Sequence, residues 1–313
     1  MDVNYKYALL SSAAIIGISL YFNNIFNIKN YEKRTQLLMT HGNTFFLDSD
    51  QIKKYRESLN SDLVLEHNDI EIMNHIKMFN KHYSKEELLI MRNNLQKLNV
   101  NYNSGSIFSA GSYNPRSNTI TLSPLLDKDD KDFKYKKALN HEVHHMSSNL
   151  GIIGNFIICG FEQIYTKNGV VRHIGKGINE GYTEYLSKNM VKSKSYSYDK
   201  IVDLIPLIEL FYDDKNELRN NYFNADLPIV IKKFSGITSM EQATELIREI
   251  DRLCFYDTYK TWFDRTDEIE IDVRTKLYDY YKKYSGCLQK EDLFFTDNML
   301  EKVEKQKLLK KKK

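Results

Sequence analysis

The chain has 313 residues, with 45 Lys and Arg against 42 Asp and Glu, three Cys, and a formal net charge of +3. Seven Lys and one Glu lie in residues 302–313, so residues 1–301 carry a net charge of −3, which argues against a specific nucleic-acid partner. A composition of 42% hydrophobic and 28% charged residues is that of a globular protein, neither disordered nor a polytopic membrane protein. The Cys residues are odd in number and far apart, so no disulfide framework is expected.

Residues 1–27 predict a membrane anchor. Tyr7–Phe22 contains no charged residue, and Ile25 and Phe26 extend the apolar run to residues 7–26, at the short end of the range for a membrane-spanning helix. We favour a single signal-anchor helix in the cell membrane. A cleaved signal peptide, which would give a secreted protein, and a buried soluble helix are the alternatives. The Lys and Arg residues after the run favour a cytoplasmic catalytic part, whereas the short N-terminal tail is typical of an anchor with an external one. We expect the catalytic part to be extracellular.

Residues 28–98 are expected to form a helical region. Apolar residues recur at spacings of three and four between Ile70 and Phe79. The sequence from Ser84 to Glu87 matches a capping box, which predicts a helix continuing to about Leu98. This region is either a separate subdomain or part of one continuous domain.

Residues 99–195 combine strands with helices. Between Asn99 and Ser123, Gly, Ser, Asn and Pro residues predict one or two strands with a turn at Asn114-Pro115, and Asn118–Leu122 alternates with period two. Periodicity and turn residues then predict two helices and a hairpin around Asn168-Gly169. These elements are Asp132–Asn149 and Ile178–Val191 for the helices, and Phe161–Ile174 for the hairpin.

The chain is expected to be helical again from Ser197, where a capping box at Thr238–Glu241 marks one helix start. The predicted fold class is therefore α+β and mostly α-helical. Its expected parts are a membrane segment (1–27), a helical region (28–98), a core of strands and helices (99–195), a C-terminal helical region (196–301) and a basic tail (302–313).

The residues most suited to chemistry begin at Asn140, where the next five residues form an HExxH pattern. On a helix, His141 and His145 are one turn apart, so their imidazoles project side by side. Two imidazole nitrogens at about 2.0–2.1 Å from one ion are what a zinc site requires. Glu142 lies about 100° around the helix, where it reaches a metal-bound water rather than the ion. Two surface histidines on a helix are the simpler alternative.

A third ligand must come from elsewhere in the chain. Ser148 and Gly151 stand where an HxxGxxH extension would continue, so a third histidine close behind is excluded. Glu162 is a carboxylate candidate in an expected strand. Glu180 and Glu184 are one turn apart on an expected helix, so one can bind the ion while the other accepts a hydrogen bond from a ligating histidine.

The sequence HEVHH followed by INEGYTE resembles the gluzincins, the thermolysin-like zinc metallopeptidases, which carry HExxH on one helix and NExxSD or a near relative on the next. The resemblance implies a zincin-like core over about residues 118–190 and Zn2+ as the cofactor. This chain departs from the pattern in having Glu at position 184 and a longer spacer between the motifs. The roles implied are metal ligands for His141, His145 and Glu180, general base for Glu142, and contacts behind the ligands for Glu184 and Asn179.

The same resemblance implies hydrolysis of peptide bonds in a peptide or protein substrate. Zinc polarises the scissile carbonyl and acidifies a bound water, and Glu142 takes the proton. In such folds a strand at the rim of the cleft pairs with an extended peptide. The candidates for that strand are Asn118, Thr119, Ile120, Thr121 and Leu122.

A Tyr or His commonly stabilises the oxyanion in these sites, and Tyr165, His173 and Tyr182 are candidates. His173 is the candidate that we carry forward as catalytic, although a surface histidine in a hairpin is the simpler interpretation. Two other functions stay open. One is a zinc-binding module without activity, which the intact Glu142 argues against, and the other is a metal hydrolase of a non-peptide substrate.

Overall fold

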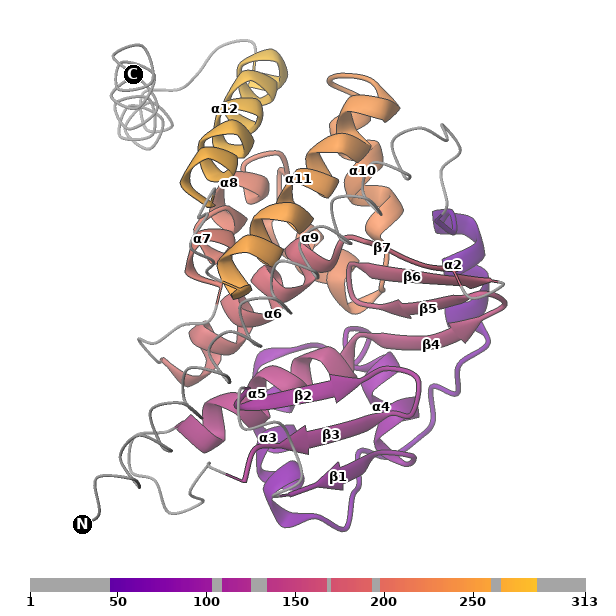
Figure 1. Cartoon of the computed structure of the whole chain (residues 1–313). Coiled ribbons are helices and arrows are strands. Elements are labelled where there is room, and N and C mark those ends of the chain that lie inside the picture. Colours follow the sequence, from indigo (N-terminus) through magenta and orange to yellow (C-terminus); the bar gives the residue numbers. More distant parts are fainter. Residues whose placement is uncertain are drawn as a thin grey trace, which may run out of the picture. The chain divides into compact units, whose positions relative to one another are not determined.

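Figure 1 shows the computed structural model of the protein, which describes residues 46–102, 109–124, 134–167, 170–192, 198–259 and 266–285. The expected membrane segment at residues 7–26, the basic tail and the hairpin turn at residues 168–169 lie outside the described residues. Within those ranges, no helix is long and apolar enough to cross a membrane. With the exception of Tyr259, the described residues belong to one compact unit.

The described chain combines helices with two small sheets, so the molecule is α+β and mostly helical, while the zincin-like core stays a prediction. The helices are α2 (Ser49–Glu57), α3 (Ile70–His82), α4 (Leu89–Leu95), α5 (Lys134–Ser147), α6 (Lys176–Val191), α7 (Asp199–Val202), α8 (Ile205–Glu209), α9 (Lys215–Phe223), α10 (Leu227–Ser235), α11 (Met240–Tyr259) and α12 (Thr266–Ser285). The strands are β1 (Asn99–Asn101), β2 (Gly111–Asn114), β3 (Thr119–Leu122), β4 (Asn149–Ile153), β5 (Phe156–Cys159), β6 (Glu162–Lys167) and β7 (Val170–Ile174).

The first sheet has the order β1-β3-β2, with β1 parallel and β2 antiparallel to β3. The predicted strand at Asn118–Leu122 is confirmed over Thr119–Leu122, but the expectation that it is a rim strand with a free edge is wrong, because it is paired on both sides. The sequence of β1, Asn-Val-Asn, is short and has one apolar residue, so it gave no strand pattern. Within the described chain, β2 pairs with β3 alone and is therefore an edge strand.

The second sheet is antiparallel, with the order β4-β5-β6-β7. The predicted hairpin at Phe161–Ile174 is confirmed as β6 and β7, which pair from Gln163 with Ile174 to Lys167 with Val170. Strands β4 and β5 were not expected. Gly154 lies in the turn between them, with a φ of 60°. Helix α5 ends at Ser147 rather than at the expected Asn149, because Asn149 is the first residue of β4.

The capping box at Ser84 is confirmed in both halves. The Glu87 amide N–H donates to Ser84 Oγ at 3.2 Å, and the Ser84 amide N–H donates to Glu87 Oε2 at 2.7 Å. The helix is shorter than expected at both ends. The hydrogen bonds of the capping box close a turn before α4, which begins at Leu89 with Leu88 as its N-cap. Helix α4 ends at Leu95, and the chain enters β1 at Asn99.

The capping box predicted at Thr238–Glu241 is wrong by one residue. The side chain that caps α11 is Ser239, whose Oγ accepts the Gln242 amide N–H at 3.2 Å. Thr238 instead donates its hydroxyl to the Phe234 carbonyl at 3.2 Å and so closes the end of α10. Adjacent Thr and Ser residues offer two registers for the same motif, and the end of the preceding helix decides between them.

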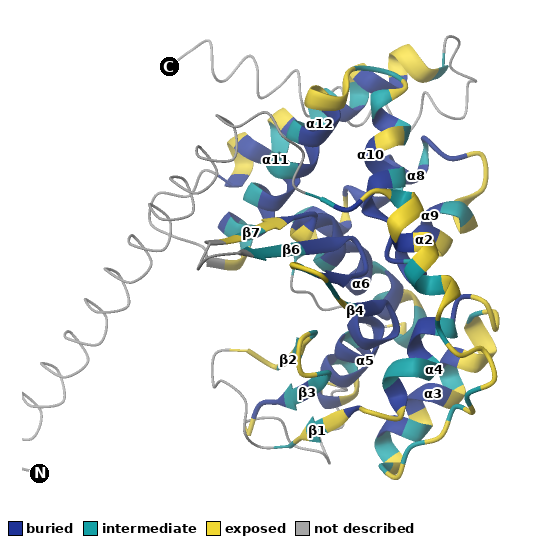
Figure 2. Ribbon diagram, turned by 90° about the vertical axis from the view of Figure 1, so that its right-hand side faces the viewer, coloured by how far each residue is buried: buried dark blue, intermediate teal, exposed yellow. Residues whose placement is uncertain are grey.

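One apolar cluster joins α3, α4, β3 and α5, so these two helices of the predicted helical region share their core with the HExxH helix. Figure 2 shows α5 and α6 buried along most of their length. The cluster includes Ile72, Ile76 and Phe79 of α3, Met91 and Leu95 of α4, Ile120 and Leu122 of β3, and Leu139, Val143 and Met146 of α5.

The start of α6 is fixed against α11. A Cβ on Gly177 would lie 2.4 Å from the Ile250 carbonyl oxygen, so only glycine allows this approach. The Asp251 carboxylate accepts the amide N–H groups of Gly175 and Gly177 at 2.9 and 2.7 Å. Burial raises the pKa of Asp251 to about 7, although these two hydrogen bonds oppose the shift. The position of α6 along its axis therefore depends on α11.

Gly175 and Gly154 provide a matched test of the close packing at the start of α6. Both have positive φ angles, of 81° and 60°. A Cβ on Gly175 would lie 2.0 Å from the Phe161 carbonyl oxygen, whereas one on Gly154 would meet nothing within 4 Å. We expect Gly154→Ala to cost about 1–2 kcal/mol for the left-handed backbone alone, and Gly175→Ala to cost about 4 kcal/mol or more. Urea unfolding of the two variants measures the difference, and equal destabilisation would contradict this account of the helix start.

Candidate metal centre

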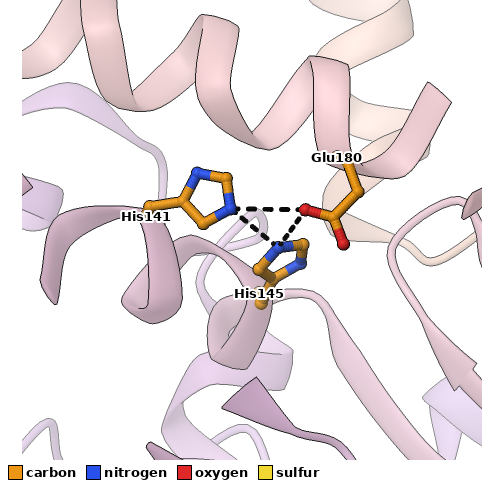
Figure 3. Close-up of side chains that lie close together, drawn as sticks. All are labelled: His141, His145 and Glu180. Atoms are coloured by element: carbon orange, nitrogen blue, oxygen red, sulfur yellow. Dashed lines mark hydrogen bonds and ion pairs between the residues drawn. The ribbon is translucent and has the colours of Figure 1, made fainter. Parts of the chain in front are cut away.

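Side chains from α5 and α6 bring three ligand atoms together (Figure 3). Nε2 of His141 and Nε2 of His145 are 3.1 Å apart, and Oε2 of Glu180 lies 3.4 and 3.3 Å from them. A tetrahedral ion with bonds of about 2.0–2.1 Å holds its ligand atoms about 3.3–3.4 Å apart. The three separations are close to those of three ligand atoms around one tetrahedral metal ion, so these side chains could hold a metal.

The local sequence explains this placement. His141 and His145 are one turn apart on α5, and Glu180 lies near the start of α6, which packs along α5. His145 is buried, while His141 and Glu180 are partly exposed. Throughout the described chain, this is the one group of His, Cys, Asp or Glu side chains close enough to share an ion.

Glu184 orients His141 from behind. Its Oε2 lies 3.0 Å from Nδ1 of His141, so Nδ1 carries the proton and Nε2 is left for a metal. Burial lowers the pKa of His141, but hydrogen bonds to Glu180 and Glu184 outweigh burial and raise it to about 10. The carboxylates around this ring therefore favour positive charge at the site.

Thr183 and Asn179 lie behind His145, with Thr183 Oγ1 at 3.4 Å and Asn179 Nδ2 at 3.3 Å from its Nδ1. Asn179 Oδ1 accepts the Phe161 amide N–H at 3.0 Å, which turns its NH2 group toward the ring. If Nε2 of His145 binds a metal, Nδ1 carries the ring proton, and the Thr183 hydroxyl oxygen is then the acceptor, because an NH2 group cannot accept a proton. Thr183 was not predicted, although it directly precedes Glu184 in the second motif.

Glu142 lies against the edge strand β2. A Cβ on Gly111 would come within 3.0 Å of Glu142 Oε1, so the missing side chain of Gly111 lets the strand approach the carboxylate closely. Glu142 is 6% exposed. Burial raises the pKa of Glu142, the two histidines lower it, and Glu180 and Glu184 raise it further. The net direction is upward, which suits a general base.

Tyr198 is a site residue that sequence reasoning missed. Its ring stacks on that of His141, with centroids 6.3 Å apart and planes 20° apart. The Glu180 carboxylate and burial raise the pKa of Tyr198, so its hydroxyl keeps its proton. Tyr198 precedes α7 with a left-handed φ of 68°. It belongs to a run of Ser, Lys and Tyr residues without motif spacing, so the sequence contained no usable signal.

The three predicted candidates for oxyanion stabilisation have other observed partners or surroundings. Nδ1 of His173 is 2.7 Å from Glu162 Oε1, and its side chain is 45% exposed. Tyr165 and His173 lie on opposite faces of the sheet, because the cross-strand partner of Tyr165 is Arg172, the neighbour of His173. Tyr182 is 1% exposed and packs with other aromatic rings.

The remaining histidine of the motif, His144, is turned into the core. It is fully buried, with Nδ1 2.8 Å from the Asn140 carbonyl oxygen and Nε2 2.8 Å from the Tyr83 hydroxyl. Burial lowers the pKa of His144 to about 3. Both ring nitrogens have partners away from the ligand atoms, so His144 supports the helix and does not extend the site.

Comparisons of the chain with protein-family models, with curated proteins and with solved structures found no match. The functional interpretation therefore depends on two short motifs and on the geometry of their side chains.

Glu180 and Glu162 provide a matched pair for testing the third ligand, since both are carboxylates that follow the HExxH motif in sequence. Only Glu180 lies with the two histidines. We expect Glu180→Ala to weaken zinc binding by more than about 100-fold, beyond the 10–100-fold typical of residues behind the ligands. Glu162→Ala should leave the affinity within a few fold of the wild type. Competition with a chromophoric chelator measures both, and the reverse ranking would refute Glu180 as a ligand.

Proposed function

We propose that this protein is a zinc-dependent metallopeptidase of gluzincin type. The observation that carries the proposal is the separation of 3.1–3.4 Å among the ligand atoms of His141, His145 and Glu180. Two imidazoles and one carboxylate are a donor set of catalytic zinc sites, which keep a fourth position for water. Imidazole ligands also favour zinc over magnesium or calcium. A zinc ion bound there would supply a Lewis acid for the scissile carbonyl and would acidify the attacking water.

Glu142 is the proposed general base. It follows His141 directly on α5, so it reaches the space beside the ligand atoms without sharing their face of the helix. Its raised pKa brings the carboxylate closer to the range in which it can accept a proton from water and return it to the leaving nitrogen.

Tyr198 is the proposed donor to the oxyanion. Its ring stacks on that of His141, and the Glu180 carboxylate is near enough to raise the pKa of its hydroxyl, so the phenol lies beside the proposed ligands. A phenol that keeps its proton can donate to developing negative charge. This contact favours Tyr198 over His173, whose observed partner is Glu162.

The edge strand β2 is the proposed binding site for the substrate backbone, in place of β3. Its free edge can pair with an extended peptide, and Gly111 brings its backbone next to Glu142. This arrangement supports a peptide or protein substrate rather than a small non-peptide one. Attachment to the cell membrane through residues 7–26, with the catalytic part outside, stays a prediction of the sequence.

The general-base role predicts that Glu142→Gln lowers kcat for peptide hydrolysis by about 10²–10⁴-fold, because the amide cannot accept the water proton. Zinc content should stay stoichiometric, since Glu142 is not a ligand. Digestion of a peptide library beside elemental analysis of both proteins measures the two effects. A wild-type protein with stoichiometric zinc and no cleavage would instead support a non-proteolytic zinc module or a hydrolase of another substrate.

The oxyanion role predicts that Tyr198→Phe lowers kcat by about 10²–10³-fold while KM and zinc affinity change little, because the lost hydrogen bond forms in the transition state. His173→Ala, at the residue first favoured by the sequence, should have a much smaller effect. Steady-state kinetics on one peptide substrate compare the two variants. A larger loss in His173→Ala would transfer the role to His173.

A further inference from the structure

A lysine outside both motifs contacts the residues behind the metal ligands. Lys137 lies four residues before His141 on α5, and its Nζ is 3.0 Å from Oε1 of Glu184. The other oxygen of Glu184, Oε2, is 3.0 Å from Nδ1 of His141. Lys137, Glu184 and His141 therefore form a continuous series of polar contacts that ends at the ring of a proposed ligand.

The two contacts hold the Glu184 carboxylate from both sides. A terminal carboxylate torsion is broad and roughly two-fold, so a carboxylate with one partner can rotate. The Lys137 ammonium contacts one oxygen of Glu184 and the His141 ring N–H contacts the other. Rotation of the carboxylate would therefore move both oxygens away from their partners. Lys137 thereby limits Glu184 to the orientation in which it accepts the His141 proton.

Burial strengthens this constraint. The side chain of Glu184 is 3% exposed and that of Lys137 is 15% exposed, so neither charge is well solvated by water. Removing one partner from a buried ion pair leaves an uncompensated charge and is strongly destabilising. Replacement of Lys137 by a neutral residue should therefore displace Glu184 or draw it toward another partner.

Lys137 also adds positive charge beside an acidic group. Glu142, Glu180 and Glu184 all act on His141 or His145, and the ammonium of Lys137 offsets part of their negative charge. The charges of Lys137 and Glu184 also act on Asp199 at the start of α7, next to Tyr198, so Lys137 has a second acidic neighbour.

We propose that Lys137 is a positioning residue of the metal centre, which holds Glu184 so that Nε2 of His141 points at the ion. The inference rests on the proposed zinc site and adds a residue that belongs to neither motif. It does not require that the protein cleave peptides, because its consequence is measured in metal affinity.

Lys137→Met tests the inference, with Lys134→Met as the matched control on the exposed first residue of α5. We expect Lys137→Met to raise the zinc dissociation constant by about 10-fold, the lower end of the range for residues behind metal ligands. Lys134→Met should not change it, and Lys137→Arg, which keeps the charge, should restore most of the affinity. Chelator competition on the full-length protein measures all three. An unchanged constant in Lys137→Met would overturn the inference.

A double-mutant cycle with Glu184→Gln separates positioning from a general structural role. If Lys137 acts through Glu184, adding Lys137→Met to Glu184→Gln should change zinc affinity by less than about two-fold. Additive losses would mean that Lys137 acts elsewhere, for example at Asp199, and would refute the inference. If the Met variant does not fold, as judged by circular dichroism, Lys137→Gln carries the same expectation. Failure of the peptidase proposal would appear separately, as zinc binding without cleavage.

Discussion

The packing of α5 against α6 is the constraint on which the proposed site depends. Helix α5 supplies two imidazoles and cannot complete a zinc site alone, and the carboxylate that completes it lies on α6. The position of α5 is set by the apolar cluster that it shares with α3, α4 and β3. The position of α6 is set by Asp251 and the glycines at its start. Two distant parts of the chain thus fix three atoms within 3.4 Å.

The sequence predicted those parts of the site in which two side chains lie one turn apart on the same helix. His141 with His145 and Glu180 with Glu184 are each one turn apart, and helical geometry alone places each pair on one face. Glu180 and the two histidines do come together. Tyr198 and Gly111 could not be predicted in the same way, because their contacts join segments far apart in the chain and follow no period.

The sheets likewise depend on contacts between distant segments, which the sequence pattern does not predict. The alternation of apolar and polar residues predicted β3, but whether a strand is central or at an edge depends on its partners. Strand β1 is too short and polar to be predicted from its sequence. Strand β4 follows α5 after a single residue and is joined to β5 by a tight glycine turn, so helix and hairpin patterns run together in that stretch. The edge next to Glu142 consequently belongs to β2, a strand that the sequence indicated without assigning it a role.

The contact between Asp251 and the start of α6 has a consequence for the order of events during synthesis. During synthesis, the HExxH helix leaves the ribosome first, the residues of the second motif leave next, and α11 leaves after both. Glu180 nevertheless lacks its fixed position until the chain has been made as far as Asp251 and α11 has packed. A nascent chain therefore holds both motifs before the three proposed ligands are together, so binding of the proposed metal should follow folding of the C-terminal helices.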